Sequence, residues 1–245
     1  MHYKLGKTPA RKGAVKFKLS VYGKKLPTPP KKAGHLGIFT AQWGMLGNDQ
    51  YGDCVWAGAA HETMLWNKEA QKDVAFVDES VLSDYAACTG FNPNDPSTDN
   101  GTDMQVAASY RQKTGIEDSQ GNRHKIGAYL EVSTIKQIKQ AIWIFGAAGI
   151  GIKFPNSAMD QFNVGKPWTV QPGSTIEGGH YIPAVNYDEK FLYVVTWGKV
   201  QKAAWSFIKK YMDEGIVYLS QEMLNDGKTL DGFDLATLQA DLAAL

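Results

Sequence analysis

Cysteine and histidine are scarce in this chain of 245 residues, which has two cysteines and five histidines. Two cysteines cannot build a disulfide framework in a chain of this size, so a reducing, cytoplasmic location is expected. No apolar run approaches the roughly 20 residues that a membrane span needs. The basic N-terminus also lacks the apolar core of about 7–15 residues that marks a secretory signal. The sequence therefore predicts no membrane association.

Acidic residues are missing from the first part of the chain. Residues 1–48 contain ten Lys or Arg and no Asp or Glu, whereas the remainder has sixteen basic and twenty-five acidic residues. The overall net charge is +1, so nucleic acid is not expected as a partner. We predict that residues 1–40 form a basic arm, which either is solvated and docks as one strand or binds a partner. Its edge strand is predicted where apolar and polar residues alternate, at Val15, Phe17, Leu19 and Val21.

Helical and strand patterns follow one another along the rest of the chain. Runs of helix formers with capping residues and glycine stops predict four helices: residues 54–71, 78–90, 103–115 and 133–146. Short apolar or alternating runs then predict strands: residues 147–154, 166–170, 180–187, 191–197 and 215–219. Helices before strands favour an α+β fold with two lobes.

The C-terminal tail, residues 226–245, has an amphipathic pattern at Phe233, Leu235, Leu238 and Leu242. It either packs on its own domain or forms an oligomer or docking contact.

Cys54 stands at the start of the first long predicted helix, with Asp53 as the expected N-cap. At that position the free backbone N–H groups and the helix dipole favour an anion. This placement lowers the pKa of a thiol and promotes the nucleophilic thiolate. On position alone Cys54 is either a nucleophile or a small buried apolar residue.

His180 is the histidine best placed to serve as a general base. It opens a predicted strand, and a hairpin turning near Asp188 sets it opposite Thr196 and Trp197, which would fix the imidazole. His61 lies on the helix of Cys54, but two turns further on, roughly 10 Å away. We therefore expect His61 to be a partly buried helix histidine.

Taken in order, these segments resemble the papain-like (C1-type) cysteine peptidases, in particular a compact bacterial or phage-type member. Asn48 stands six residues before Cys54, where the family has Gln, and Gly52 stands two before it. Trp56-Ala57 follow with one residue inserted. Further on, DNGTDMQVAASYRQKTGI and GGHYIPAVNYDEKFLYVVTWG resemble the family's Asn-Gly-Gly loop and its histidine strand. The similarity runs from about residue 40 to 220.

The resemblance implies a papain-like two-lobed fold. A helical N-terminal lobe, about residues 41–145, would carry Cys54, and a β-rich C-terminal lobe, about 146–225, would carry His180. These lobes make up a domain of residues 41–225, and the cleft would lie between them.

The same resemblance implies hydrolysis of a peptide or isopeptide amide by a Cys-His dyad. The implied catalytic set is Cys54, His180 and Thr196. Asn48, with the Cys54 backbone N–H, would hold the oxyanion, and Gln50 is a second candidate donor. No metal or cofactor is implied. The substrate cleft would be lined by Gly101, Thr102, Gly179 and Trp197.

Two departures from the family pattern bear on activity. Val195 stands where the family has the Asn that orients its histidine, and Thr102 replaces the second Gly of the Asn-Gly-Gly loop and would narrow the groove. They favour an alternative, a papain-fold structural or assembly protein of a phage or prophage with weak or no catalysis. Such a protein would be virion-associated and would bind an assembly partner through the arm or the tail. Acyl transfer by the same dyad is a third alternative.

Overall fold

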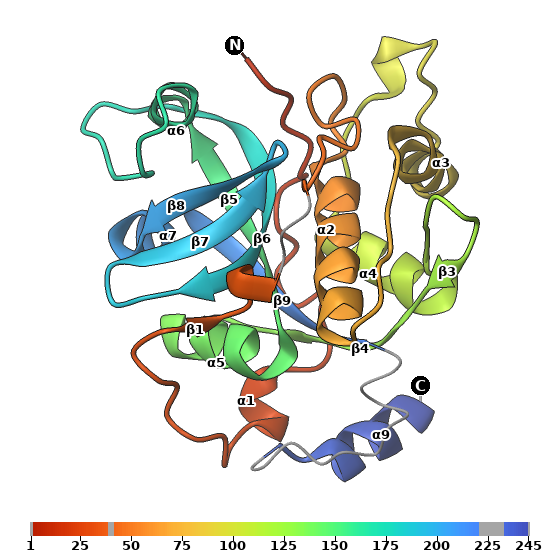
Figure 1. Cartoon of the computed structure of the whole chain (residues 1–245), viewed down its shortest axis with the longest axis vertical. Helices are drawn as coiled ribbons and strands as arrows, with labels where there is room; N and C mark the ends of the chain where they lie inside the picture. Colours follow the sequence, from red (N-terminus) through yellow and green to blue (C-terminus); the bar gives the residue numbers. More distant parts are fainter. Residues whose placement is uncertain (1, 39–41, 221–232, 245) are drawn as a thin grey trace.

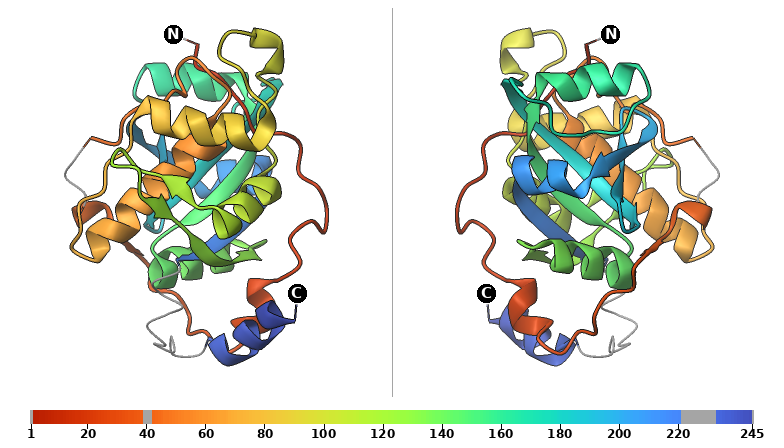
Figure 2. Two further views of the ribbon diagram at one scale, coloured as in Figure 1. Left: turned by 90° about the vertical axis from the view of Figure 1, so that its right-hand side faces the viewer. Right: turned by 90° about the vertical axis from the view of Figure 1, so that its left-hand side faces the viewer.

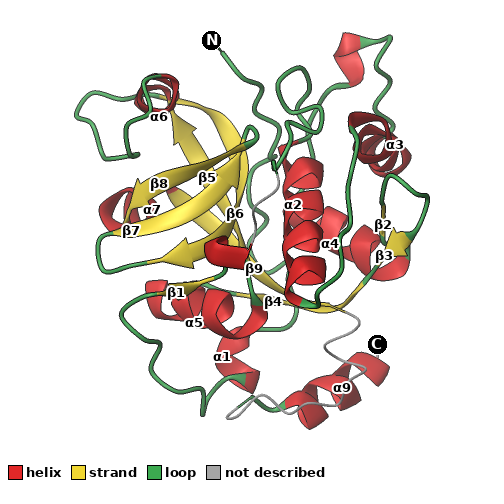
Figure 3. Ribbon diagram, in the orientation of Figure 1, coloured by secondary structure: helices red, strands yellow, loops and turns green. Residues whose placement is uncertain are grey.

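The computed structural model describes residues 2–38, 42–220 and 233–244. Within these residues, most of the strands lie on one side of the molecule, and helices lie both on the other side and around the sheet (Figure 3). The helices are α1 (Leu19–Tyr22), α2 (Cys54–Glu69), α3 (Asp78–Thr89), α4 (Met104–Lys113), α5 (Ile135–Phe145), α6 (Asn156–Asn163), α7 (Trp205–Tyr211) and α9 (Leu235–Ala243), with single 3-10 turns at Leu36–Ile38 and Pro96–Thr98. None of the helices in the described part of the chain is both long and apolar enough to cross a bilayer.

A large antiparallel sheet forms the second lobe. Its strands in the described residues are β1 (Ala33–Gly34), β4 (Ile126–Glu131), β5 (Ala148–Pro155), β6 (Ile176–Tyr187), β7 (Phe191–Thr196), β8 (Lys199–Ala204) and β9 (Met212–Ser220). They run in the order β4-β9-β5-β6-β7-β8, and β1 pairs with β6. A separate two-stranded ribbon joins β2 (Ile116–Glu117) to β3 (Arg123–His124). The α+β fold predicted from the sequence is confirmed.

The helix boundaries follow local capping chemistry. Asp103 caps α4 because its side chain accepts hydrogen bonds from the N–H groups of Gln105 and Val106. Thr134, and not the neighbouring serine, caps α5 in a capping box with Gln137. Gly90 ends α3 with φ of 78°, a left-handed conformation that glycine adopts without strain.

Each lobe is stabilised by its own large cluster of buried apolar residues. One lies around the sheet and its covering helices α5, α6 and α7, and the other lies between α2, α3 and α4. Helix α2 stands beside β6 at the boundary of the two (Figure 1). Tyr181 of β6 packs in the helical core, so burial of apolar surface joins the lobes as well as filling each one.

Several sequence predictions are corrected here. The edge strand predicted around Val15–Val21 is not formed, because Leu19–Tyr22 makes one helical turn that buries Leu19 and Tyr22. The arm's edge strand is instead β1, at Ala33–Gly34. The predicted strand at residues 166–170 is reduced to a single bridge between Trp168 and Ala203. Strands β4 and β8 and helices α6 and α7 were not predicted.

The C-terminal helix α9 packs on its own chain next to α1 (Figure 2). Phe233, Leu235 and Leu238 of its predicted apolar face are buried, and the Tyr22 hydroxyl donates to Asp241 at 2.7 Å. Within the described residues, the amphipathic pattern therefore serves intramolecular packing. Residues 226–232 and 245 of the predicted tail lie outside the described part of the chain.

Candidate functional site

Cys54 is the first residue of α2 and is 2% exposed. Asp53 is the N-cap, as predicted, but its side chain makes no capping hydrogen bond. The backbone N–H of Tyr181 on β6 donates to Cys54 Sγ at 3.4 Å. The sulfur therefore lies against the strand residue that directly follows His180.

Gly58 allows this close approach of helix and strand. A Cβ atom at Gly58 would come within 2.4 Å of the Tyr181 ring, far inside normal van der Waals contact. Since Gly58 lies one turn after Cys54, the missing side chain sets how near the start of α2 lies to β6.

The His180 imidazole is held on two sides. Its Nε2 lies 2.7 Å from Thr196 Oγ1, and its ring stacks on Trp197 with centroids 4.4 Å apart and planes 16° from parallel. Both predicted contacts of His180 are thus present. Its Nδ1 is buried and has no hydrogen-bond partner among the described residues. The ring is fixed, and one nitrogen is left unengaged.

Strand alternation explains why Thr196 and not Val195 contacts His180. Successive side chains of a strand point to opposite faces. Val195 is fully buried in a small cluster with Trp43 and Leu65, while Thr196 faces the imidazole. The hydroxyl of Thr196 therefore supplies the contact to His180 that Val195 cannot make.

The N-terminal segment, residues 3–9, lies along this site (Figure 1). Lys7 N–H donates to Gly179 O at 3.0 Å, next to His180. Gly6 O accepts from Thr102 N–H at 2.7 Å, and Thr8 N–H donates to Thr102 O at 3.1 Å. These three bonds pair the segment with both predicted walls of the cleft.

Gly6 packs directly against the start of α2. A Cβ atom at Gly6 would fall 1.6 Å from Gly52 O, so no other residue fits without a shift of backbone. Tyr3 stacks on Trp197 with centroids 5.0 Å apart. The segment therefore covers Cys54 on one side and the Trp197 support of His180 on the other.

The Thr102 side chain points away from the segment, contrary to the prediction that it narrows the groove. Its Oγ1 accepts from Trp56 Nε1 at 2.9 Å, and both residues are buried. Only the backbone of Thr102 faces Gly6 and Thr8. The backbone edge of Thr102 thus pairs with an extended chain, here the segment itself.

Burial changes the proton affinities that position alone predicts. The pKa of the Cys54 thiol is raised to about 12, first by burial and then by the neighbouring Asp53, although the Tyr181 and Gly6 backbones lower it. The predicted lowering of this pKa by the helix dipole is therefore wrong for the covered site, where desolvation dominates. Burial likewise lowers the pKa of His180 to about 3. Thiol and imidazole are both neutral near pH 7 while the segment is in place.

The two candidate oxyanion donors differ in burial. Asn48 is 2% exposed, and its Nδ2 donates to Tyr51 O at 3.1 Å. Gln50 is exposed, in the turn before α2. Asn48 lies near the helix start and contacts Asp53, whose carboxyl pKa is held well above its ordinary value by burial. The oxyanion role of both side chains stays a prediction.

His61 is a structural histidine, as expected from its position. Its Nε2 lies 2.9 Å from Trp43 O, and burial lowers its pKa to about 4. Among the described residues, no three His, Cys, Asp or Glu side chains gather as metal ligands would.

Sequence reasoning missed the groups that surround Lys7. The Lys7 side chain is fully buried, and its ammonium contacts Asp213 at 3.0 Å and Glu214 at 2.8 Å. These carboxylates lie on β9, more than 200 residues away along the chain. Nothing in the Lys-rich arm distinguishes Lys7 from its neighbours, and only the Gly6-Lys7 pair hints at a close backbone approach.

Comparison with known proteins identifies solved structures with a similar fold. No protein-family model and no curated protein sequence matches the chain. Solved structures do match. Xylellain, a cysteine protease from Xylella fastidiosa, aligns with a TM-score of 0.69 and 16% identity, covering 89% of this chain and 98% of that one.

Two further structures agree. The procathepsin B S9 of Trypanosoma congolense aligns with a TM-score of 0.67 and 11% identity, over 89% of this chain and 87% of that one. A cysteine protease of Carica candamarcensis aligns with a TM-score of 0.54 and 13% identity, over 78% and 98%. The chain therefore has the papain-like fold that its sequence predicted.

Proposed function

We propose that this chain is a cysteine peptidase of the papain-like fold, latent while its N-terminal segment covers the site. Cys54 would be the nucleophile, His180 the general base and Thr196 the residue that positions the imidazole. The observation that carries the proposal is the fixed His180 ring. Thr196 and Trp197 hold it with Nδ1 unengaged, on the strand whose next residue donates to Cys54 Sγ.

The chemistry follows from that placement. With the Nε2 proton donated to Thr196, Nδ1 is the basic nitrogen and takes the thiol proton. The thiolate sulfur bonds to the amide carbon, the C–N bond breaks, and the imidazolium returns the proton to the leaving amine. Water, deprotonated by His180, then cleaves the thioester and regenerates the thiol. Asn48 and the Cys54 N–H would stabilise the oxyanion in both steps.

Asp53 has a specific part in this scheme. Burial holds the pKa of its carboxyl well above the ordinary value, so the group beside Cys54 tends to be neutral. A charged Asp53 carboxylate would raise the pKa of the Cys54 thiol by Coulomb repulsion, so a neutral Asp53 favours formation of the thiolate.

Displacement of the segment is the step that would activate the site. When residues 3–9 leave, solvent reaches Cys54 and His180, and the desolvation that keeps both neutral is relieved. The thiolate and imidazolium can then stabilise each other, as the helix N-terminus also favours. We expect the full-length protein to be slow until this happens.

The test uses Gly6→Ala, which the Gly52 backbone cannot accommodate, with Gly37→Ala as the matched control, since a Cβ there meets nothing within 4 Å. Iodoacetamide alkylation of Cys54 and cleavage of an internally quenched peptide pool are measured near pH 7. Both rates should rise in Gly6→Ala and stay at the wild-type level in Gly37→Ala. Cleavage should vanish when Cys54→Ala is added. Branched isopeptides are added to the same assay, and their cleavage shows whether the enzyme hydrolyses isopeptide bonds as well as peptide bonds.

An assembly protein with little catalysis is the second candidate. The covered site and the high pKa of the Cys54 thiol favour it. Fast alkylation of Gly6→Ala without cleavage of any peptide or isopeptide would establish this alternative and reject the peptidase. Acyl transfer would appear in the same assay as ligation of an added amine nucleophile.

A further inference from the structure

Lys7 fills a pocket built for a cation. The side chain has no exposed surface, while Asp213 and Glu214 are 12% and 18% exposed. Its ammonium also donates to Thr8 O at 3.0 Å. An ammonium buried in this way is stable only with its charge compensated and its donors satisfied, and the three oxygens do both.

Gly151 of β5 supplies the space for the lysine stem. A Cβ atom at Gly151 would come within 2.2 Å of Lys7 Cε and within 2.8 Å of the side chains of Glu214 and Met104. The backbone at Gly151 does not have a positive φ, so alanine fits its conformation. The glycine is therefore needed at this position for room, and not for backbone geometry.

Lys7 leaves one acceptor of the pocket without a partner among the described residues. Two carboxylates face one ammonium, and Asp213 Oδ1 is buried without a hydrogen-bond partner among the described residues. Lysine ends in a single point charge, whereas the guanidinium of arginine has five donors in a planar fork. An arginine side chain would satisfy Oδ1 as well as the oxygens that Lys7 now contacts.

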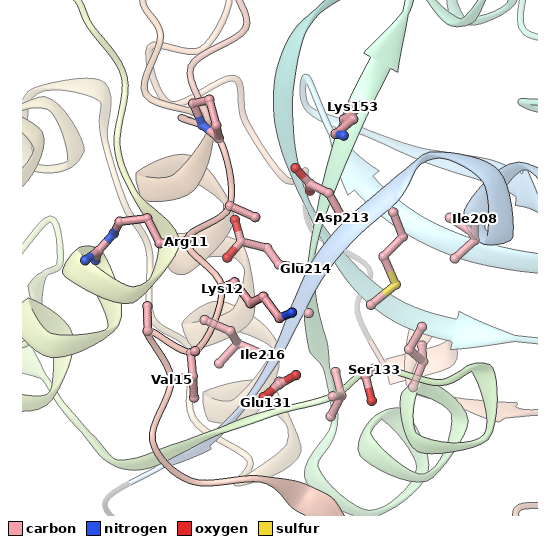
Figure 4. A pocket seen from close by; sticks show the side chains of 18 of the residues that line it. Arg11, Lys12, Val15, Glu131, Ser133, Lys153, Ile208, Asp213, Glu214 and Ile216 are labelled. Atoms are coloured by element: carbon pink, nitrogen blue, oxygen red, sulfur yellow. The ribbon is translucent and has the colours of Figure 1, made fainter.

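The pocket is also reachable from outside. Asp213 and Glu214 line a cavity of about 830 Å³ beside the chain that follows Lys7, and Figure 4 shows Asp213 near Lys153 and Glu214 toward the chain that carries Arg11 and Lys12. A side chain entering from an extended peptide on the Thr102 edge would thus meet the same two acids.

We propose that the pocket formed by Gly151, Asp213 and Glu214 is a specificity pocket that takes the lysine or arginine side chain of a peptide substrate, with Lys7 as its resident occupant. That the bound peptide is a substrate rests on the proposed peptidase function. That its side chain is basic rests on the contacts of Lys7. The substrate class is therefore peptides with a basic residue close to the amide that Cys54 attacks.

Binding is measured first, without turnover. Full-length Gly6→Ala/Lys7→Ala/Cys54→Ala protein, in which Gly6→Ala displaces the tethered segment, is titrated with fluorescent peptides of residues 2–12 that carry Lys, Arg, norleucine or Glu at position 7. Fluorescence anisotropy should show that the Lys and Arg peptides bind about 10- to 150-fold more tightly than norleucine, since a hydrogen-bonded charge is worth about 1.5–3 kcal/mol. The Glu peptide should bind worst.

Variants of the pocket residues test which of them cause the preference for a basic side chain. Asp213→Asn/Glu214→Gln in the same background should equalise Lys and norleucine, while norleucine binding reports that the protein is folded. Gly151→Ala should weaken both peptides, because it removes space. Glu177→Gln, which changes an exposed carboxylate in a neighbouring cavity that Lys7 and Asp213 also line, should keep the preference for lysine. Equal binding of Lys and norleucine to the unmodified pocket would overturn the proposal.

Cleavage separates this inference from the proposed function. Full-length Gly6→Ala is incubated with a proteome-derived peptide library, and the cut sites are determined by mass spectrometry. Enrichment of Lys and Arg at one position near the cut supports the pocket. Cleavage without any basic preference rejects the pocket and keeps the peptidase. Preferential binding of basic peptides without cleavage rejects the peptidase and keeps the pocket as a basic-peptide site.

Discussion

The hydroxyl of Thr196 is the one polar group that holds His180 at Nε2 in the described part of the chain. Thr196→Val keeps the shape of the side chain and removes this contact. The buried N–H would be left unpaired at a cost of about 1–3 kcal/mol, so kcat/KM should fall about 5- to 150-fold. The loss should lie mainly in kcat, because Thr196 does not face the segment that marks the peptide path.

Thr196→Ser is the matched control for this prediction, since it keeps the hydroxyl and should restore most of the activity. Steady-state kinetics in the Gly6→Ala background compare the three proteins. An unchanged kcat in Thr196→Val would mean that stacking on Trp197 alone orients the imidazole.

His61 makes stability depend on pH. Burial lowers its folded-state pKa to about 4, against about 6.5 in an unfolded chain. Between these values the unfolded state binds the extra proton, so the free energy of unfolding falls as the pH drops from 6.5 toward 4. The contribution of His61 should be about 3 kcal/mol lower at pH 4 than at pH 7.

Other buried groups titrate in the same range, so the comparison with His61→Gln isolates this one histidine. A glutamine amide can still donate to Trp43 O. Urea unfolding at pH 7, 6, 5 and 4 should show the wild type losing stability relative to His61→Gln at each step. A constant difference between the two proteins would show that His61 has the same pKa in the folded and unfolded states.

At the scale of elements, the sequence predicted what local chemistry determines. The helices at Cys54, Asp78 and Met104 begin at or within one residue of their predicted starts, and the hairpin turn near Asp188 was correct. These features depend on a few adjacent residues. The contacts of His180 followed from the hairpin alone.

The N-terminal segment could not be predicted in this way. It is extended without a periodic pattern, and it is held by Gly52, Thr102 and Gly179, which belong to three distant parts of the chain. The Lys7 pocket is likewise made of single residues from β5 and β9. Tertiary contacts of this kind leave no local signal in one sequence. The same holds for the pKa of Cys54, which burial decides.

The packing of α2 on β6 provides a prediction for this pair of elements. Gly58→Ala should gain about 1 kcal/mol of helix propensity, but its Cβ would lie 2.4 Å from the rigid ring of Tyr181. Overpacking of this kind costs about 1–3 kcal/mol, so a net loss of stability is expected. Because α2 carries Cys54 and β6 carries His180, the shift should also lower kcat.

Urea unfolding and peptide cleavage test both parts in the Gly6→Ala background, with Gly37→Ala as a control that adds a methyl group in open space. A more stable Gly58→Ala protein would show that helix propensity outweighs the contact with Tyr181. Normal kcat in a destabilised variant would show that the site geometry does not depend on this contact.

At the scale of the whole molecule, a buried charge pair ties the helical lobe to the sheet. Arg111 of α4 donates to Glu62 of α2 at 2.7 Å, and the other Glu62 oxygen accepts from the Tyr181 hydroxyl at 2.5 Å. The guanidinium also lies 4.2 Å from the centre of the Tyr218 ring on β9. Four elements from both lobes therefore meet at one buried ion pair.

Loss of Arg111 should be severe for this reason. Arg111→Met keeps most of the side-chain stem but leaves Glu62, whose pKa burial already raises, without its cation. Removing one partner of a buried pair costs about 3–5 kcal/mol. Lys68→Met is the matched control, because it breaks the exposed pair with Asp73, and such pairs are worth about 0–1 kcal/mol.

The double variant Glu62→Gln/Arg111→Met completes the test. The glutamine amide introduced by Glu62→Gln can still accept from Tyr181 and carries no charge, so the double variant should be about 1–3 kcal/mol more stable than the sum of the single losses predicts. Urea unfolding followed by tryptophan fluorescence measures the wild type, both single variants, the double variant and the control. If Arg111→Met unfolds at the same urea concentration as Lys68→Met, the lobes are held by apolar packing alone. A double variant as unstable as the summed singles would mean that Arg111 acts through its contact with Tyr218, and not through Glu62.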